Sequence, residues 1–312
     1  MYKRQTKHIA DISLTKGYKS DKEDNGDTKS HFFLNSEIDL AFDSLLSSKL
    51  DINLEKTSSD TYLKIFEFNS PLLLGSLSEL NSSIKLELEN ENFDLMTSFE
   101  IFETLSGSNS DRFTYVLPNF SFSKNILFEN FDGNLMFTSS GNNKLYNTNI
   151  NETSIINDLN YESNNFFSKS GFKNKYTILL KNVSSIGKNS IKYKESVQSD
   201  LSSAFIFDSM FPLEKENNQY RELLTPKISL RFNPTQMKNY KTNSSRLDTS
   251  NLFSKNRIGI SDTLEAGRSI TVGLDYENKK KNITHNEHED FLKLELGTVL
   301  RDKKEENIPK NS

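Results

Sequence analysis

Apolar and polar residues alternate strictly over long parts of this chain. Because successive side chains of a β-strand point to opposite faces, the alternation predicts strands with one apolar face and one charged face. Roughly a dozen such runs occur, most of them about 9–11 residues long. The clearest are 34–43, 50–55, 84–89, 93–101, 228–232, 270–276 and 292–296.

Clusters of turn-forming residues separate the runs and predict the reversals between antiparallel strands. These clusters are 24–27, 106–109, 130–134 and 278–282. A helical period of 3.6 residues is never sustained beyond about two turns. The best helical candidate, 155–167, is rich in Asn and Ser, which are poor helix formers. The pattern therefore predicts an all-β, antiparallel protein.

The 312-residue chain contains little apolar material for its length. Only 34% of its residues are hydrophobic and the mean hydropathy is −0.64, so a thick two-layer core is not expected. The 23 Phe, the 11 Tyr and a net charge of only −4 still separate it from disordered chains.

Charge and residue types exclude several functions. Lys and Arg are spread along the chain and the pI is near 5.7, so nucleic-acid binding is not expected. No window approaches the roughly 18 consecutive apolar residues of a transmembrane helix. The absence of Cys excludes disulfides, a thiol nucleophile and Cys-ligated metal, and no cofactor is predicted.

The possible β-architectures differ in what the charged face of the strands contacts. In a sandwich the polar face meets solvent and the apolar faces pack on each other, whereas in a membrane barrel the apolar face meets lipid and the polar face lines a wet lumen. Run length, run number and low hydropathy favour the barrel. We expect an antiparallel transmembrane β-barrel, here an incomplete, open and curved sheet, with a sandwich or a solenoid as the alternatives.

Aromatic residues near the ends of runs are candidates for the girdles of a membrane barrel. They are Phe32, Phe33, Phe113, Tyr115, Tyr176 and Tyr276. The chain lacks Trp, which is common in such girdles, so Tyr and Phe would take its place.

The two ends of the chain suggest a fragment. Residues 1–5 (MYKRQ) resemble the translation of a sequencing adapter and are expected to be non-native, and the chain stops in a polar stretch at 305–312. We therefore expect residues 6–312 to be a partial barrel domain from the interior of a longer protein.

Four segments, in matching order and spacing, resemble the LptD family of LPS-assembly outer-membrane proteins. They are 111–123, 223–230, 251–262 and 294–301. The residues that carry the family motifs are Leu117, Pro118, Pro226, Asn256, Arg257, Gly259 and Asp262. Two departures stand out: Thr263 replaces an Arg of the family pattern, and the family's cysteines are absent.

In the family a periplasmic jelly roll precedes the barrel, so the resemblance implies that residues 6–312 lack the N-terminal jelly roll and the last strands. It also implies a cell outer membrane location and a role in inserting lipopolysaccharide into the outer leaflet. In the family the sugars pass through a polar lumen and the acyl chains leave by a lateral opening, with no covalent chemistry, so no enzyme activity is expected. The implied partners are lipopolysaccharide, an LptE-like plug lipoprotein, an LptA-like periplasmic bridge protein that binds the missing N-terminal domain, and membrane lipids.

The cluster of Asn256, Arg257, Gly259 and Asp262 has two interpretations. It forms a functional group of residues in the lumen or an outer loop, or it is a turn in which Gly259 adopts a strained backbone angle and an Arg–Asp pair holds the turn. We favour the turn. The prolines, among them Pro118 and Pro226, are expected at strand starts, bulges or edges because they lack a ladder donor.

Other chemical candidates are weaker. The stretch 285–290 offers His and carboxylate groups for a metal ion, but a solvated loop is the simpler interpretation. Alternating carboxylates such as Glu87 and Glu89 fit the wet face of a strand better than a catalytic pair. A general porin-like channel would share every strand feature and stays open as the alternative function.

Overall fold

The computed structural model describes residues 5–16, 28–106, 111–127, 132–217, 219–282 and 287–310, with backbone only at 281–282 and 287–289. Residues 1–4, the turn expected at 24–27 and parts of those at 106–109 and 130–134 lie outside the described residues. So do His285 and Asn286, and the side chains of 287–289, from the candidate metal stretch.

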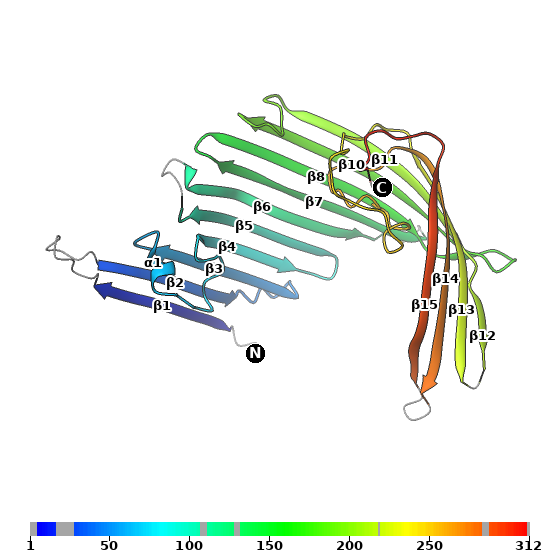
Figure 1. Cartoon of the computed structure of the whole chain (residues 1–312), viewed down its shortest axis with the longest axis horizontal. Helices are drawn as coiled ribbons and strands as arrows, with labels where there is room; N and C mark the ends of the chain where they lie inside the picture. Colours follow the sequence, from blue (N-terminus) through cyan, green and yellow to red (C-terminus); the bar gives the residue numbers. More distant parts are fainter. Residues whose placement is uncertain are drawn as a thin grey trace. The chain divides into compact units, whose positions relative to one another are not determined.

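The expectation of an all-β, antiparallel fold is confirmed. Figure 1 shows the strands in sequence, and every pairing whose register is described is antiparallel. The strands are β1 (Thr6–Lys16), β2 (Thr28–Asp39), β3 (Ser47–Thr57), β4 (Glu79–Glu89), β5 (Phe93–Thr104), β6 (Phe113–Ile126), β7 (Gly133–Tyr146), β8 (Ile150–Ser163), β9 (Phe166–Phe167), β10 (Lys173–Lys188), β11 (Gln198–Met210), β12 (Leu213–Glu216), β13 (Tyr220–Asn233), β14 (Gly267–Asn282) and β15 (Glu287–Arg301). The described residues include a single short helix, α1 (Tyr62–Ile65).

All of these strands belong to one 15-stranded sheet, which is open. Neighbours follow the sequence from β1 to β15, with β9 and β12 paired beside the main path. In the described residues β1 and β15 each have a single neighbour. No helix in the described part of the chain is long and apolar enough to cross a bilayer.

The chain divides into two compact units. Unit 1 comprises residues 1–124, 138–156 and 184–199, and unit 2 comprises 125–137, 157–183 and 200–312. The seven predicted runs fall on strands, except that the first, 34–43, continues past the end of β2 at Asp39. The segment 155–167, considered a poor helix from its sequence, lies mostly in β8. One local prediction is wrong: 278–282 continues β14 instead of turning, with a register shift between Asn278 and Lys279.

The two faces of the sheet in unit 1 differ in the way the alternation predicts. Ile84 is 46% exposed and stands beside the equally apolar Ile52 and Phe99 on neighbouring strands. On the other face Asn53 is only 4% exposed and Ser98 is buried. Apolar side chains are therefore exposed and polar ones covered, the reverse of a water-soluble sheet.

The connection from β3 to β4, residues 58–78, covers part of this polar face. Tyr62 of α1 shares a buried cluster with Phe33 of β2, and its hydroxyl lies 3.0 Å from His31 Nδ1. The Glu55 carboxylate accepts the backbone N–H groups of Leu74 at 2.6 Å and Asn81 at 2.8 Å. The hydrophobic core of unit 1 thus lies between this connection and the strands.

Phe33 is consequently not a girdle residue. It points to the polar face and is fully buried, whereas Phe32, its neighbour in sequence, is exposed on the apolar face. Adjacent strand residues face opposite ways, so only one of the two can contact lipid. The other girdle candidates are partly buried.

Pro118 lies at a bulge, as predicted. The β5–β6 register shifts between Ser98 and Glu100, so Leu117 and Pro118 together oppose one residue of β5.

Pro226 instead lies inside β13, where the prediction of a strand start, bulge or edge is wrong. Its carbonyl accepts the N–H of Phe211 at 2.9 Å, at the break between β11 and β12. In an antiparallel sheet the N–H and C=O of one residue face the same neighbouring strand. Pro226, which has no N–H, therefore faces the gap between β11 and β12, where no strand residue needs that donor.

Candidate functional site

The candidate site lies on the polar face of unit 2, where the connection from β13 to β14 packs back on the strands. We call residues 234–266 the β13–β14 segment. Pro234 cannot continue the strand ladder, and Asn233 Oδ1 accepts the N–H of Thr235 at 2.8 Å, which turns the chain out of β13. Asn233 Nδ2 also donates to the carbonyl of Glu265 at 2.9 Å. One buried side chain therefore joins the start and the end of the segment.

The segment has a small core of its own and rests on the strands. Met237, Ile258 and Ile260 form a buried cluster. Its Leu252 and Phe253 lie against glycines of β14 and β15 on the polar face. The Lys227 ammonium of β13 lies 4.4 Å from the centre of the Phe253 ring and 2.6 Å from Asp275 Oδ2. Apolar contact and cation–π contact both fix the segment against the sheet.

Arg257 and Glu265 form the central ion pair of the site. Their side chains are almost fully buried, and Arg257 donates from Nε at 2.5 Å and from Nη2 at 2.6 Å to the two carboxylate oxygens. Arg257 also donates to Ser269 Oγ at 2.8 Å and to Thr271 Oγ1 at 2.9 Å, both on β14. Arg301 of β15 donates from Nε to Glu265 Oε1 at 2.8 Å. The pair thus links the segment to two strands.

The electrostatics of Glu265 follow from these contacts. Burial by itself raises the pKa of Glu265, but the hydrogen bonds and charge of Arg257, with the charge of Arg301, outweigh burial. The net result is a pKa below the ordinary glutamate value. The carboxylate is therefore ionised at neutral pH and stabilises the buried arginines.

Two further cations hold the segment by its backbone. Arg231 of β13 donates to the carbonyls of Lys255 at 2.8 Å and Ser254 at 2.6 Å. Lys181 of β10 donates to the carbonyl of Ser261 at 2.7 Å. Charged side chains on the polar face of the strands therefore donate hydrogen bonds to carbonyl groups of the β13–β14 segment, which has no regular backbone partners for them.

The predicted residues Asn256, Arg257, Gly259 and Asp262 do come together in one turn. Gly259 has φ +68°, its N–H donates to the carbonyl of Asn256 at 3.1 Å, and Asn256 Nδ2 donates to Ile260 at 2.7 Å. The left-handed angle is one that glycine adopts at little cost.

The expected Arg–Asp pair within this turn is wrong. Arg257 pairs with Glu265, whereas Asp262 accepts a hydrogen bond from the Tyr240 hydroxyl and lies 3.6 Å from the Lys238 ammonium. A clue to Glu265 was present in the sequence, since it is a lone charge between apolar neighbours. The remaining motif residues lie elsewhere: Leu117 and Pro118 on β6, and Pro226 within β13.

This site shows binding and packing chemistry. Its cations meet carboxylates, hydroxyls and carbonyls, and no nucleophile with an adjacent base is found among its described residues. Within the described ranges no group of His, Asp and Glu is placed to hold a metal ion. The arrangement covers the polar face of β13–β15 with a fixed segment.

The exposed faces define the class of protein. In unit 2 Phe232 is 43% exposed while the adjacent Arg231 is 6% exposed, and the same inversion recurs along β14. Strands with exposed apolar faces and covered polar faces are typical of outer-membrane β-barrels.

The chain belongs to the LptD family, because the family model described as LPS transport system D matches residues 29–312. No curated protein matches the chain. LptD proteins are outer-membrane proteins of LPS transport and are not a known enzyme family. This protein is therefore involved in the transport of LPS to the outer membrane.

Proposed function

We propose that the chain forms barrel wall of the outer-membrane LPS translocon, with its polar face lining the lumen and its apolar face in lipid. The observation that carries this proposal is the inverted burial of neighbouring residues such as Arg231 and Phe232. A hydrocarbon environment favours exposed apolar side chains and penalises charged ones, so the membrane covers one face only.

The proposed route separates the two parts of LPS. Exposing acyl chains to water costs about 0.8 kcal/mol per methylene, and moving sugars through hydrocarbon leaves their hydroxyls without hydrogen-bond partners. A polar lumen for the sugars and a lateral opening for the acyl chains avoid both costs. LPS then reaches the outer leaflet without any bond being made or broken.

The polar face of unit 1 supports a lumen that contacts sugar. A hollow of about 860 Å³ is lined by charges of both signs, among them Lys7, Glu37, Lys49, Asp51 and Glu87. Such a surface offers hydrogen-bond donors and acceptors for hydroxyl and phosphate groups. Because its positive and negative charges nearly cancel, its net electrostatic field is weak.

Connection lengths support an orientation in the membrane. Within unit 2 the long β13–β14 segment leaves one end of the strands, whereas at the other end β14 stops at Asn282 and β15 begins at Glu287, only a few residues later in the sequence. Within unit 1 the connection 58–78 is likewise much longer than the turn 90–92 at the opposite end. Outer-membrane barrels have long outer loops and short periplasmic turns. The β13–β14 segment then belongs to the outer side.

The same proposal includes the partners. Among the described residues β1 and β15 each have one neighbour, and their other edges suit closure by further strands, since an open edge is not tolerated in hydrocarbon. An LptE-like lipoprotein would fill the lumen and an LptA-like protein would deliver LPS from the periplasm. Residues 6–312 in this view supply wall, while the jelly roll and the gate belong to other parts of the assembly.

The test is a complementation experiment in Gram-negative cells depleted of their own translocon. Cells that produce a translocon in which residues 6–312 replace the matching barrel segment should again place newly made LPS on the surface, measured by its accessibility to an added modifying enzyme. Planar-bilayer conductance is measured in parallel. If the protein instead gives large, steady solute conductance and no surface LPS, the porin-like alternative replaces the proposal.

A further inference from the structure

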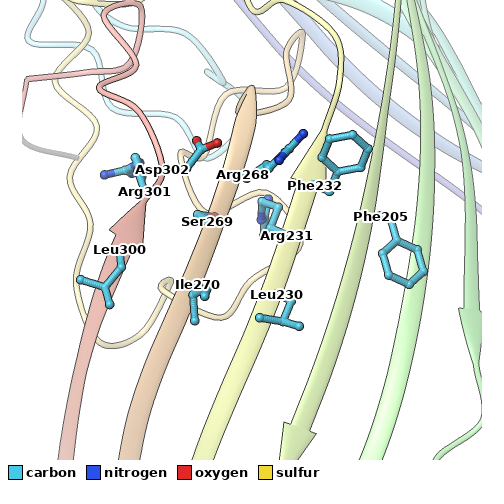
Figure 2. A pocket seen from close by; sticks show the side chains of 10 residues that line it. All are labelled: Phe205, Leu230, Arg231, Phe232, Arg268, Ser269, Ile270, Leu300, Arg301 and Asp302. Carbon is cyan, nitrogen blue, oxygen red and sulfur yellow. The ribbon is translucent and has the colours of Figure 1, made fainter.

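The exposed face of unit 2 contains an apolar groove of about 720 Å³ near the ends of β13, β14 and β15. The apolar side chains that line it are Phe205, Leu230, Phe232, Ile270 and Leu300 (Figure 2). Each of them is more than one-third exposed. The groove therefore lies on the face proposed to meet lipid, away from the β13–β14 segment on the polar face.

Arg268 gives one end of the groove a positive charge. Its guanidinium carbon lies 5.5 Å from the centre of the Phe232 ring, toward which the side chain is directed in Figure 2. Arg268 is exposed and, in the part of the chain that the structure describes, forms no ion pair. An arginine held on an aromatic ring keeps its donors free for a bidentate anion such as phosphate.

Arg268 and Asp302 are the exposed charged residues that line this end of the groove. Asp302 lies across from Arg268, and its N–H donates to the Arg268 carbonyl at 3.2 Å. Lys303 and Lys304 are followed by Glu305 and Glu306, and these four residues line a separate hollow. Arg231 and Arg301 donate to the β13–β14 segment on the polar face, so Arg268 is the cation that can bind an anionic headgroup at this end of the groove.

The position of the groove along the strands indicates which lipid it contacts. The groove lies where β13 ends and β14 begins, at the end of the strands from which the β13–β14 segment leaves. In the orientation of the proposed function, on which this step rests, that end faces the outer leaflet. The phosphorylated lipid of the outer leaflet is LPS.

We propose that this groove is a binding site for one resident LPS molecule on the outside of the barrel, separate from the transport route. An acyl chain lies over Phe205, Leu230 and Ile270, and a sugar phosphate binds Arg268. Burying the chain against exposed side chains and pairing the phosphate with a guanidinium both stabilise the complex.

The experiment measures LPS bound to purified protein in lipid nanodiscs by native mass spectrometry. Wild type is expected to retain LPS, and R268Q to bind it about tenfold more weakly, because a charge-assisted contact of this kind contributes that much. The matched control is R246Q, which removes another exposed arginine at the same end but outside the groove. Heat-modified gel mobility confirms that each variant is folded.

The LPS binding of the variants distinguishes a specific site from no site. Equal LPS binding by wild type, R268Q and R246Q overturns the site, and so does a loss in R268Q that is matched by R246Q. If R268Q loses phosphatidylglycerol and LPS equally, the groove recognises phosphate lipids in general and the assignment to LPS is wrong. F232A, which removes the ring beneath Arg268, provides a second variant and should weaken binding in the same direction. Binding is scored on isolated protein, so failed surface delivery in cells would refute the proposed function without touching this measurement.

Discussion

Gly273 of β14 lies directly opposite Gly297 of β15, and the two glycines leave the space that Phe253 and Leu252 occupy. A Cβ atom at position 273 would lie 2.7 Å from the Phe253 ring, and one at 297 would lie 2.8 Å from Leu252 Cδ1. Missing side chains on two strands thus determine where the β13–β14 segment packs.

Substituting Gly273 by alanine should loosen the segment. The added methyl group overlaps the Phe253 ring, which has to move, at a cost of about 1–3 kcal/mol. Limited proteolysis should cut within residues 234–266 faster in G273A than in wild type. In the double variant F253A/G273A the overlap is gone, so the two effects should not add. Strict additivity would show that the ring does not rest on this glycine.

Breaking the buried ion pair should have a larger effect. In R257M the Glu265 carboxylate keeps Arg301 but loses its bidentate partner, and removing one partner of a buried pair costs about 3–5 kcal/mol. Hydrogen exchange of the β13–β14 segment should rise sharply while the strands of unit 1 stay protected. The control is R246M, in the same segment but exposed, which should leave exchange unchanged. Equal exchange in both variants would contradict a central role for the pair.

Acid should release the same segment. Because the folded-state pKa of Glu265 lies below the ordinary value of 4.5, the unfolded segment binds more protons and its stability falls as pH falls. The contribution is complete above pH 4.5 and is lost as the pH decreases toward the lower folded pKa. Protease resistance of residues 234–266, followed with an acid-stable protease, should decline over this range.

E265Q tests the assignment of this acid effect. The amide cannot titrate, so E265Q should be less stable at neutral pH and should lose the pH dependence near and below 4.5. An unchanged acid response in E265Q would assign the effect to other carboxylates.

The sequence predicts the strands well because alternation is a local property. The alternation alone assigns neighbours such as Asn53 and Leu54 to opposite faces, and in the structure Asn53 is buried and Leu54 is exposed. The turn predicted at 278–282 was wrong because polar residues suit the polar face of a strand as well as a loop. Local composition does not distinguish the two cases.

The candidate site was only half predictable. The turn around Gly259 could be foreseen from its own residues, but the partner of Arg257 depends on how a long segment folds back. Glu265 reaches Arg257 together with Arg301, which is 36 residues away. Contacts of that kind come from the tertiary structure, so the spacing of Arg257 and Asp262 suggested the wrong pair.

A charge placed on either face of one strand should separate a membrane wall from a water-soluble sheet. Ile84 is on the exposed apolar face of β4, so I84R should lower the free energy of unfolding by about 2–4 kcal/mol near the bilayer midplane. Ser83, the adjacent residue, lies on the polar face opposite Glu100, and S83R should be close to neutral because its charge meets a carboxylate. Urea unfolding in liposomes, read by heat-modified gel mobility, measures both variants. If I84R and S83R were equally stable, lipid would not cover the apolar face, and the wall that the LPS route requires would have to lie elsewhere in the protein.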